Sequence, residues 1–205
     1  MQHDFILLDR SGSMTGTMWT EALNAINAYV KKLAEDNVDT GVTLAVFDSN
    51  EPFKVVRDRI TPKTWHDVSN ADASPRGGTP LNDATGKLLD LAEKGTPNGV
   101  QYDKVAIVIM TDGHENASHE YTVEKIKNRL DSVRSRGWQV IFLGANFDNA
   151  SQAASYGAVR GSTISTSAAN FVGTMEKTAS LRSAYGATGA TMSYSEDDKK
   201  KFAGK

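Results

Sequence analysis

The chain has 205 residues, with 23 Lys and Arg against 25 Asp and Glu and a formal net charge of −2. This length suits one domain with a sizeable hydrophobic core. The lack of a basic excess argues against sequence-independent binding to nucleic acid and against binding to anionic membranes. Because the sequence contains no cysteine, it excludes disulfides, a cysteine nucleophile, a thiolate zinc site and an iron–sulfur centre.

The N-terminal residues carry no targeting pattern. No basic segment precedes a long apolar run, so we expect no secretory signal. No apolar run approaches the ~18 residues that a membrane span needs. We therefore expect a cytoplasmic protein that contacts no membrane.

Short apolar runs alternate along the chain with segments of helical periodicity. Strands are predicted at residues 5–8, 42–46, 53–56, 105–110, 140–143 and, weakly, 158–164. Helices are predicted at residues 18–35, from Thr79-Pro80 to Gly95, at 123–133, near 148–156 and near 168–185. The second and third strands are joined by so short a turn that they must run antiparallel. Residues 57–78 show no regular pattern.

Alternating strands and helices predict an α/β fold: a Rossmann-like, open, doubly wound and mostly parallel sheet with helices on both faces. The antiparallel strand would lie at an edge. We expect one domain over residues 1–188 and a polar, Lys-rich C-terminal tail over residues 189–205 with at most two helical turns. In such sheets, ligands bind beyond the carboxyl ends of the strands.

Oxygen-bearing side chains follow the predicted strands at three places. Asp9, Ser11 and Ser13 come after the first strand, Thr79 follows Gly77-Gly78, and Asp112 follows the most apolar strand. Each fragment alone is an ordinary cap or turn. Together they bring two carboxylates and three hydroxyls to one sheet edge, the donor set that hard cations such as Mg²⁺ prefer.

This three-part pattern, Asp9-x-Ser11-x-Ser13, Thr79 and Asp112, resembles the metal-ion-dependent adhesion site of von Willebrand factor type A domains. The resemblance implies a six-stranded sheet and a free-standing bacterial or phage-type member. It also implies that the three hydroxyls bind Mg²⁺ or Mn²⁺, that the aspartates act directly or through water, and that a partner carboxylate fills the open position. The rim residues expected to contact the partner are Met14, Arg76, Gly113, His114 and Glu115.

The expected function is metal-dependent protein binding without turnover, with a partner that supplies Asp or Glu. A second hypothesis is an accessory subunit that docks on a separate AAA+ ATPase, because some members of the family that the chain resembles work beside MoxR-type or chelatase-like ATPases and this chain has no Walker motif. A metal-dependent phosphohydrolase is disfavoured because residue 11 is Ser, where D-x-D phosphotransferases have a second carboxylate. His114-Glu115 begins no zinc-protease motif, since residue 118 is Ser.

Overall fold

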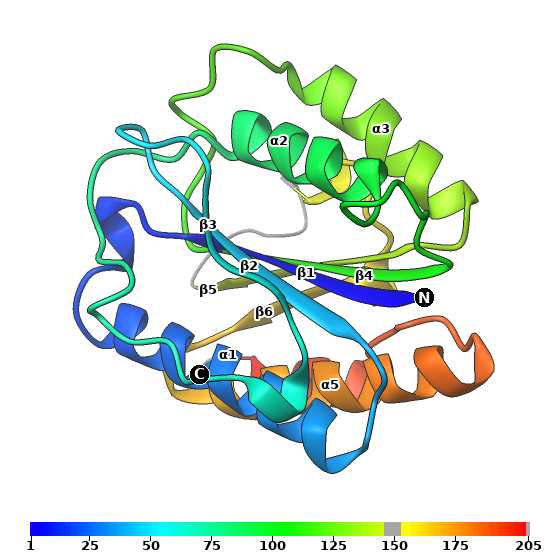
Figure 1. The fold of residues 1–205 in the computed structure, drawn as a ribbon. Coiled ribbons are helices and arrows are strands. Elements are labelled where there is room, and N and C mark those ends of the chain that lie inside the picture. Colours follow the sequence, from blue (N-terminus) through cyan, green and yellow to red (C-terminus); the bar gives the residue numbers. More distant parts are fainter. Residues whose placement is uncertain (146–152, 204–205) are drawn as a thin grey trace.

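The computed structural model describes residues 1–145 and 153–203 as a three-layer α/β arrangement (Figure 1). The strands are β1 (Gln2–Asp9), β2 (Gly41–Phe47), β3 (Lys54–Ile60), β4 (Lys104–Thr111), β5 (Gln139–Ala145) and β6 (Thr163–Thr166). The main helices are α1 (Thr17–Glu35), α2 (Leu81–Lys94), α3 (Val123–Ser135), α5 (Phe171–Thr188) and α6 (Glu196–Phe202). Helices α2 and α3 cover one face of the sheet, and α1 and α5 cover the other (Figure 1).

The sheet has the order β3-β2-β1-β4-β5-β6, and only β3 pairs antiparallel with its neighbour. The predicted fold class and the antiparallel edge strand are therefore confirmed. Strands β1 and β4 are buried on both faces, because their successive apolar residues enter two separate core clusters. In β1, Phe5 and Leu7 pack towards α2 and α3, whereas Ile6 and Leu8 pack towards α1 and α5.

Two strand boundaries differ from those predicted, and one predicted helix cannot be compared. Strand β3 continues to Ile60, which pairs with Val42 of β2 beyond a register shift, and Thr43 Oγ1 accepts a hydrogen bond from Arg59 N in this irregular stretch. The weak strand expected at 158–164 is wrong over most of its length, since residues 160–162 form a 3₁₀ turn and β6 starts only at Thr163. The helix expected near 148–156 falls mostly outside the described residues.

Helix α2 begins one residue later than predicted, and Thr79 does not cap it. Pro80 is the N-cap and makes no side-chain capping bond. The first amides are satisfied from another loop instead: Glu115 Oε2 accepts from Asn82 N at 2.7 Å, and Ser118 Oγ accepts from Asp83 N at 3.1 Å. The Thr79 hydroxyl is therefore released from capping.

Residues of the predicted polar tail pack against the rest of the domain as far as Phe202. Met192, Tyr194 and Phe202 are at most 5% exposed and belong to the core cluster that contains α1 and α5. Helix α6 begins with a capping box between Ser195 and Asp198. The seven residues of α6 make about two turns, the upper limit expected.

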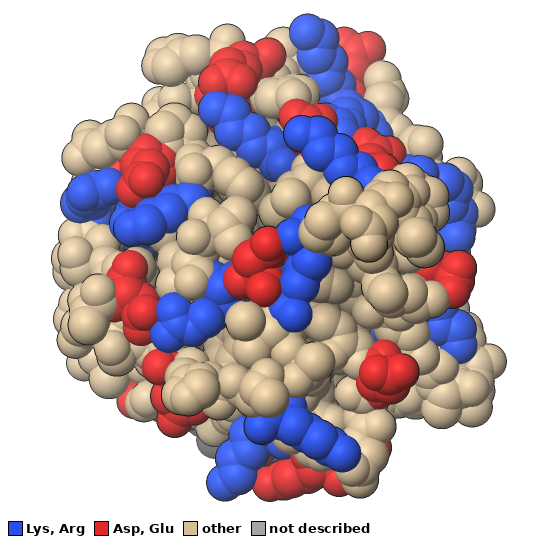
Figure 2. Space-filling model, viewed as in Figure 1, with Lys and Arg blue, Asp and Glu red and all other residues tan. Residues whose placement is uncertain are grey.

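The surface in Figure 2 carries acidic and basic side chains next to one another, with no single-sign field on this face. The ion pairs among the described residues include Arg57–Asp72 and Arg129–Glu93. Within the part of the chain that the structure describes, no helix combines the length and the apolar character needed to cross a membrane.

Candidate metal site

The candidate site lies at the edge of the sheet where the paired parallel strands β1 and β4 end. Asp9 is the last residue of β1, and Asp112 directly follows β4. Ser11 and Ser13 belong to the loop and short 3₁₀ turn after β1. Since parallel neighbours end on the same side, both aspartates reach one edge.

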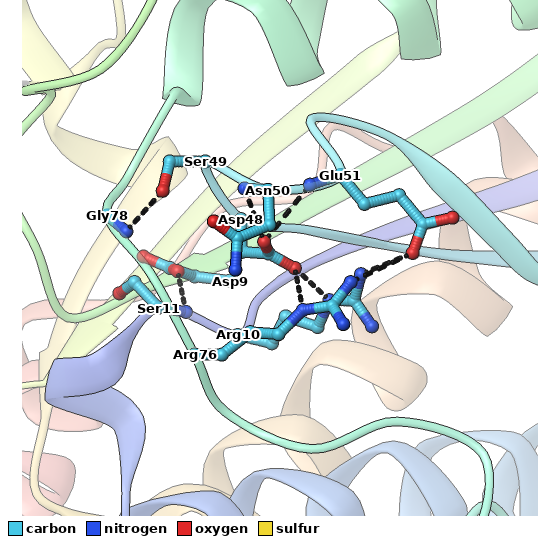
Figure 3. Close-up of polar contacts among 9 residues, drawn as sticks. All are labelled: Asp9, Arg10, Ser11, Asp48, Ser49, Asn50, Glu51, Arg76 and Gly78. Atoms are coloured by element: carbon cyan, nitrogen blue, oxygen red, sulfur yellow. Dashed lines mark hydrogen bonds and ion pairs between the residues drawn. The ribbon is translucent and has the colours of Figure 1, made fainter.

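Hydrogen bonds join four of the five predicted ligand residues. Ser13 Oγ donates to Asp112 Oδ1 at 2.7 Å, and the hydroxyl oxygens of Ser11 and Ser13 are 3.0 Å apart. Ser11 N donates to Asp9 Oδ1 at 2.7 Å, which closes the turn after β1. Figure 3 shows the Asp9 and Ser11 side chains next to each other. The oxygen donors therefore converge.

Thr79 reaches the same space from the loop before α2. A Cβ atom added to Gly113 would lie 3.0 Å from Thr79 Oγ1 and 3.6 Å from Ser13 Oγ. The glycine thus leaves room beside both hydroxyls. All five predicted residues lie at this edge of the sheet, although they come from three distant parts of the chain.

The two carboxylates carry charge that no cationic side chain within residues 1–145 and 153–203 balances. Asp9 is fully buried, and its pKa rises to about 6 chiefly because of burial, with a further contribution from the Asp112 charge. Burial also raises the pKa of Asp112. None of the ion pairs among the described residues includes either aspartate. A buried unpaired carboxylate is costly, so this arrangement fits a bound cation.

The donor set also indicates the type of cation. Across residues 1–145 and 153–203, no three His, Cys, Asp or Glu side chains gather as a metal cluster. The candidate site instead combines two carboxylates with three hydroxyls, so all its donors are oxygen. That set fits Mg²⁺ or Mn²⁺, which bind oxygen ligands with few carboxylates and several waters.

Two residues absent from the predicted ligand set hold these ligands in place. Thr111 Oγ1 donates to Asp9 Oδ2 at 2.7 Å, so both oxygens of Asp9 are oriented. Asn116 Oδ1 accepts from Thr79 N at 2.8 Å, and Asn116 N donates to Thr79 O at 3.1 Å. Thr111 is adjacent to Asp112 in sequence and could have been suspected, whereas no spacing links Asn116 to Thr79.

The predicted rim residues differ in what they offer to a partner. His114 is exposed, Gly113 is half-buried, and the Arg76 side chain is 46% exposed. Met14 is 1% exposed and packs in the core, so it presents no surface. The Glu115 carboxylate accepts four hydrogen bonds from the loop that follows it and from the start of α2.

A second polar network lies directly beside Asp9 (Figure 3). Asp48, fully buried after β2, forms ion pairs through Oδ2 with Arg10 Nε at 2.6 Å and Arg76 Nε at 3.1 Å. Both arginines also contact Glu51 Oε2, at 2.7 and 3.2 Å. The two arginines and the two acidic residues of this network neutralise one another. The network therefore does not neutralise the charge of Asp9 and Asp112.

Comparisons with known proteins agree with this architecture. The solved structures similar to this chain include a von Willebrand factor type A protein from Catenulispora acidiphila (TM-score 0.62, 14% identity, 88% of this chain and 42% of that chain). They also include proximal thread matrix protein 1 from the mussel byssus (TM-score 0.62, 13% identity, 89% of this chain and 46% of that chain). A third is a manganese-loaded Plasmodium vivax TRAP protein (TM-score 0.53, 14% identity, 84% of this chain and 71% of that chain).

This chain spans less than half the length of the first two structures. At such low identity the likeness shows the fold alone. No curated protein gives a significant match to the sequence. The model of the von Willebrand factor type A domain matches residues 5–185, which covers most of the chain, and we conclude that this protein belongs to the von Willebrand factor type A domain family.

Proposed function

We propose that this protein is a metal-dependent protein-binding module that recognises a carboxylate of its partner. Asp9, Ser11, Ser13, Thr79 and Asp112 would hold Mg²⁺ or Mn²⁺. The observation that carries the proposal is a pair of carboxylates without a cationic partner among the residues that the structure describes, beside three converging hydroxyls. The manganese-loaded TRAP protein, which shares the fold, supports it.

The charge of the site suits an acidic ligand. Asp9 and Asp112 together neutralise a divalent cation, and the three hydroxyls add no further negative charge. A bound ion supplies a coordination position that a carboxylate oxygen of the partner can take. A site of four carboxylates would instead repel an incoming Asp or Glu.

One carboxylate contact cannot by itself hold a protein, because association and ordering cost several kcal/mol. The loops around the site must therefore supply the rest of an interface, of about 800 Å² on each partner. Of the predicted rim residues, Arg76 and His114 are exposed enough to contribute. A partner with an acidic residue on a protruding loop fits this surface.

We also propose that the site binds without catalysing a reaction. A serine nucleophile needs a general base that accepts its proton. The Ser13 hydroxyl donates to Asp112. We propose that the charge of this carboxylate balances the bound cation, so that Asp112 does not serve as a general base. Incubation with p-nitrophenyl phosphate and Mg²⁺ or Mn²⁺ should release no nitrophenol. Turnover that disappears in Asp9→Ala would favour the hydrolase hypothesis.

Calorimetric titration with Mn²⁺ tests the metal site directly. The wild-type protein should bind one ion, and Asp112→Ala should not. Asp197→Ala is a matched control, because its side chain is 95% exposed on α6. Absence of Mn²⁺ binding to the wild type would refute the proposal.

Partner capture in Mg²⁺ and in EDTA then tests the carboxylate step. A true partner should bind only with metal, and should lose binding when its own contacting Asp or Glu is replaced by Asn or Gln. Recovery of a protein with a Walker motif under these conditions would favour docking on an AAA+ ATPase. A partner that binds equally well in EDTA would contradict the carboxylate step.

A further inference from the structure

The segment that carries Thr79 has little structure of its own. Sixteen residues, 65–80, separate the 3₁₀ turn at Pro62–Thr64 from α2, and they contain no helix or strand. Ordering such a segment costs conformational entropy. Contacts with other elements must therefore fix the position of the Thr79 hydroxyl.

The turn between β2 and β3 supplies these contacts. Ser49 Oγ accepts a hydrogen bond from Gly78 N at 2.8 Å, and Ser49 N donates to Gly78 O at 3.0 Å. Both backbone groups of the residue before Thr79 are thus held by one residue of the turn. Figure 3 shows Ser49 facing Gly78, beside the end of β1.

The turn itself is held by the buried Asp48. Asp48 Oδ1 accepts from Asn50 N at 2.7 Å and from Glu51 N at 3.1 Å, which closes the turn. Its other oxygen forms the ion pairs with Arg10 and Arg76 described above. Since Arg76 N also donates to Arg10 O at 2.7 Å, the loop after β1, the turn and the Thr79 segment are tied together.

The two glycines before Thr79 are explained by these contacts. A Cβ at Gly77, whose φ is +68°, would lie 2.6 Å from Ser49 Oγ. A Cβ at Gly78 would lie 3.0 Å from Asn116 Oδ1, the atom that accepts from Thr79 N. A side chain at either position would push Ser49 or Asn116 away from the segment. Glycine at 77 and 78 therefore allows the close approach of both residues.

We propose that the β2–β3 turn, residues 48–51, is a fourth loop of the metal site, in which Ser49 is a positioning residue that preorganises Thr79 for the ion. This inference rests on the proposed function. It adds a residue that makes no contact with the ion, and it assigns to the Arg10–Asp48 pair the role of holding that residue. If the segment were released, only a fraction of molecules would present Thr79 correctly, and the apparent affinity would fall by that fraction.

Ser49→Ala tests the inference against two matched variants. Ser49→Thr keeps the hydroxyl, and Ser74→Ala removes an exposed hydroxyl from the same irregular segment. Loss of one hydrogen bond should raise the Mn²⁺ dissociation constant of Ser49→Ala roughly three- to tenfold. Ser49→Thr and Ser74→Ala should bind like the wild type, and the melting temperature of metal-free Ser49→Ala should stay within about 2 °C of the wild type.

Hydrogen exchange of the metal-free protein gives a second readout that needs no metal. The Gly78 and Thr79 amides should exchange faster in Ser49→Ala and at the wild-type rate in Ser74→Ala. Equal Mn²⁺ affinity of Ser49→Ala and the wild type, or unchanged exchange of these amides, would overturn the inference while leaving the metal site intact. Failure of the wild type to bind Mn²⁺ would refute the proposed function itself and this inference with it.

Discussion

Arg182 of α5 and Asp4 of β1 form an ion pair whose side chains are 0% and 1% exposed. Asp4 also accepts hydrogen bonds from Thr40 Oγ1 at 2.8 Å and from Tyr29 Oη at 3.2 Å. The guanidinium also lies over the Tyr185 ring at 5.5 Å. The last long helix is thereby fixed to the strand that ends, five residues later, at Asp9.

Removing one member of this pair should destabilise the fold strongly. Arg182→Met leaves the Asp4 carboxylate buried without its cation, and we expect a loss of about 3–5 kcal/mol in the free energy of unfolding. Urea denaturation measures this. Lys200→Met, which removes an ammonium group 80% exposed on α6, should change the value by less than about 0.5 kcal/mol. A loss below about 1 kcal/mol for Arg182→Met would mean that the pair contributes little.

Metal binding should raise the thermal stability, because the ion binds the folded protein and not the unfolded chain. At an Mg²⁺ concentration of about 100 times the dissociation constant, the gain is about 2.7 kcal/mol, which corresponds to a rise in Tm of roughly 5–10 °C. Asp112→Ala should abolish this rise and change the metal-free Tm little, because it removes a charge that repels Asp9. Thermal melts with and without Mg²⁺ check both. Collapse of the metal-free variant would show that Asp112 is needed for folding instead.

Gly113→Ala should weaken metal binding without disturbing the fold. The new methyl group would lie 3.0 Å from Thr79 Oγ1, so that hydroxyl must move. We expect the Mn²⁺ dissociation constant to rise about tenfold, a change of about 1.4 kcal/mol. Gly99→Ala is the comparison: nothing lies within 4 Å of its added Cβ, and its cost is backbone strain at φ +77°. Gly99→Ala should therefore lower Tm and leave the Mn²⁺ affinity unchanged.

The parts of the fold that were predictable carry local signals. The unbroken apolar run of β4 indicates burial on both faces, and the short turn before β3 permits only an antiparallel pairing. The two aspartates were found in the same way, because Asp9 and Asp112 come at the ends of the apolar strands β1 and β4. Residues at the end of a parallel strand lie at the edge of the sheet. Their position can therefore be predicted without knowing any side-chain contact.

What escaped prediction depends on loops that approach one another from distant parts of the chain. Ser49 and Asn116 hold the Thr79 segment through backbone hydrogen bonds, which leave no trace in composition or spacing. Thr79-Pro80 looks like a helix start, yet Glu115 provides the capping bond from 33 residues away. Met14 follows Ser13 in sequence, but the 3₁₀ turn rotates its side chain into the core.

His3 should make stability depend on pH. Its side chain is 2% exposed and its ring accepts or donates a hydrogen bond with Thr43 Oγ1 at 2.9 Å. Burial, with smaller contributions from Arg59 and Arg182, lowers the pKa of His3 to about 3, against 6.5 for a free side chain. Between pH 6.5 and about 3, His3 is therefore protonated in the unfolded chain but neutral in the folded protein.

Stability should consequently fall as the pH decreases from about 6.5 towards 3. At pH 5 the contribution of His3 amounts to a loss of about 2 kcal/mol relative to pH 7. His3→Gln keeps a hydrogen-bonding group for Thr43 and has no proton to take up. Urea denaturation at pH 7 and pH 5 should show a loss in the wild type that exceeds the loss in His3→Gln by about that amount. Equal losses in both proteins would show that His3 is protonated as readily in the folded protein as in the unfolded one.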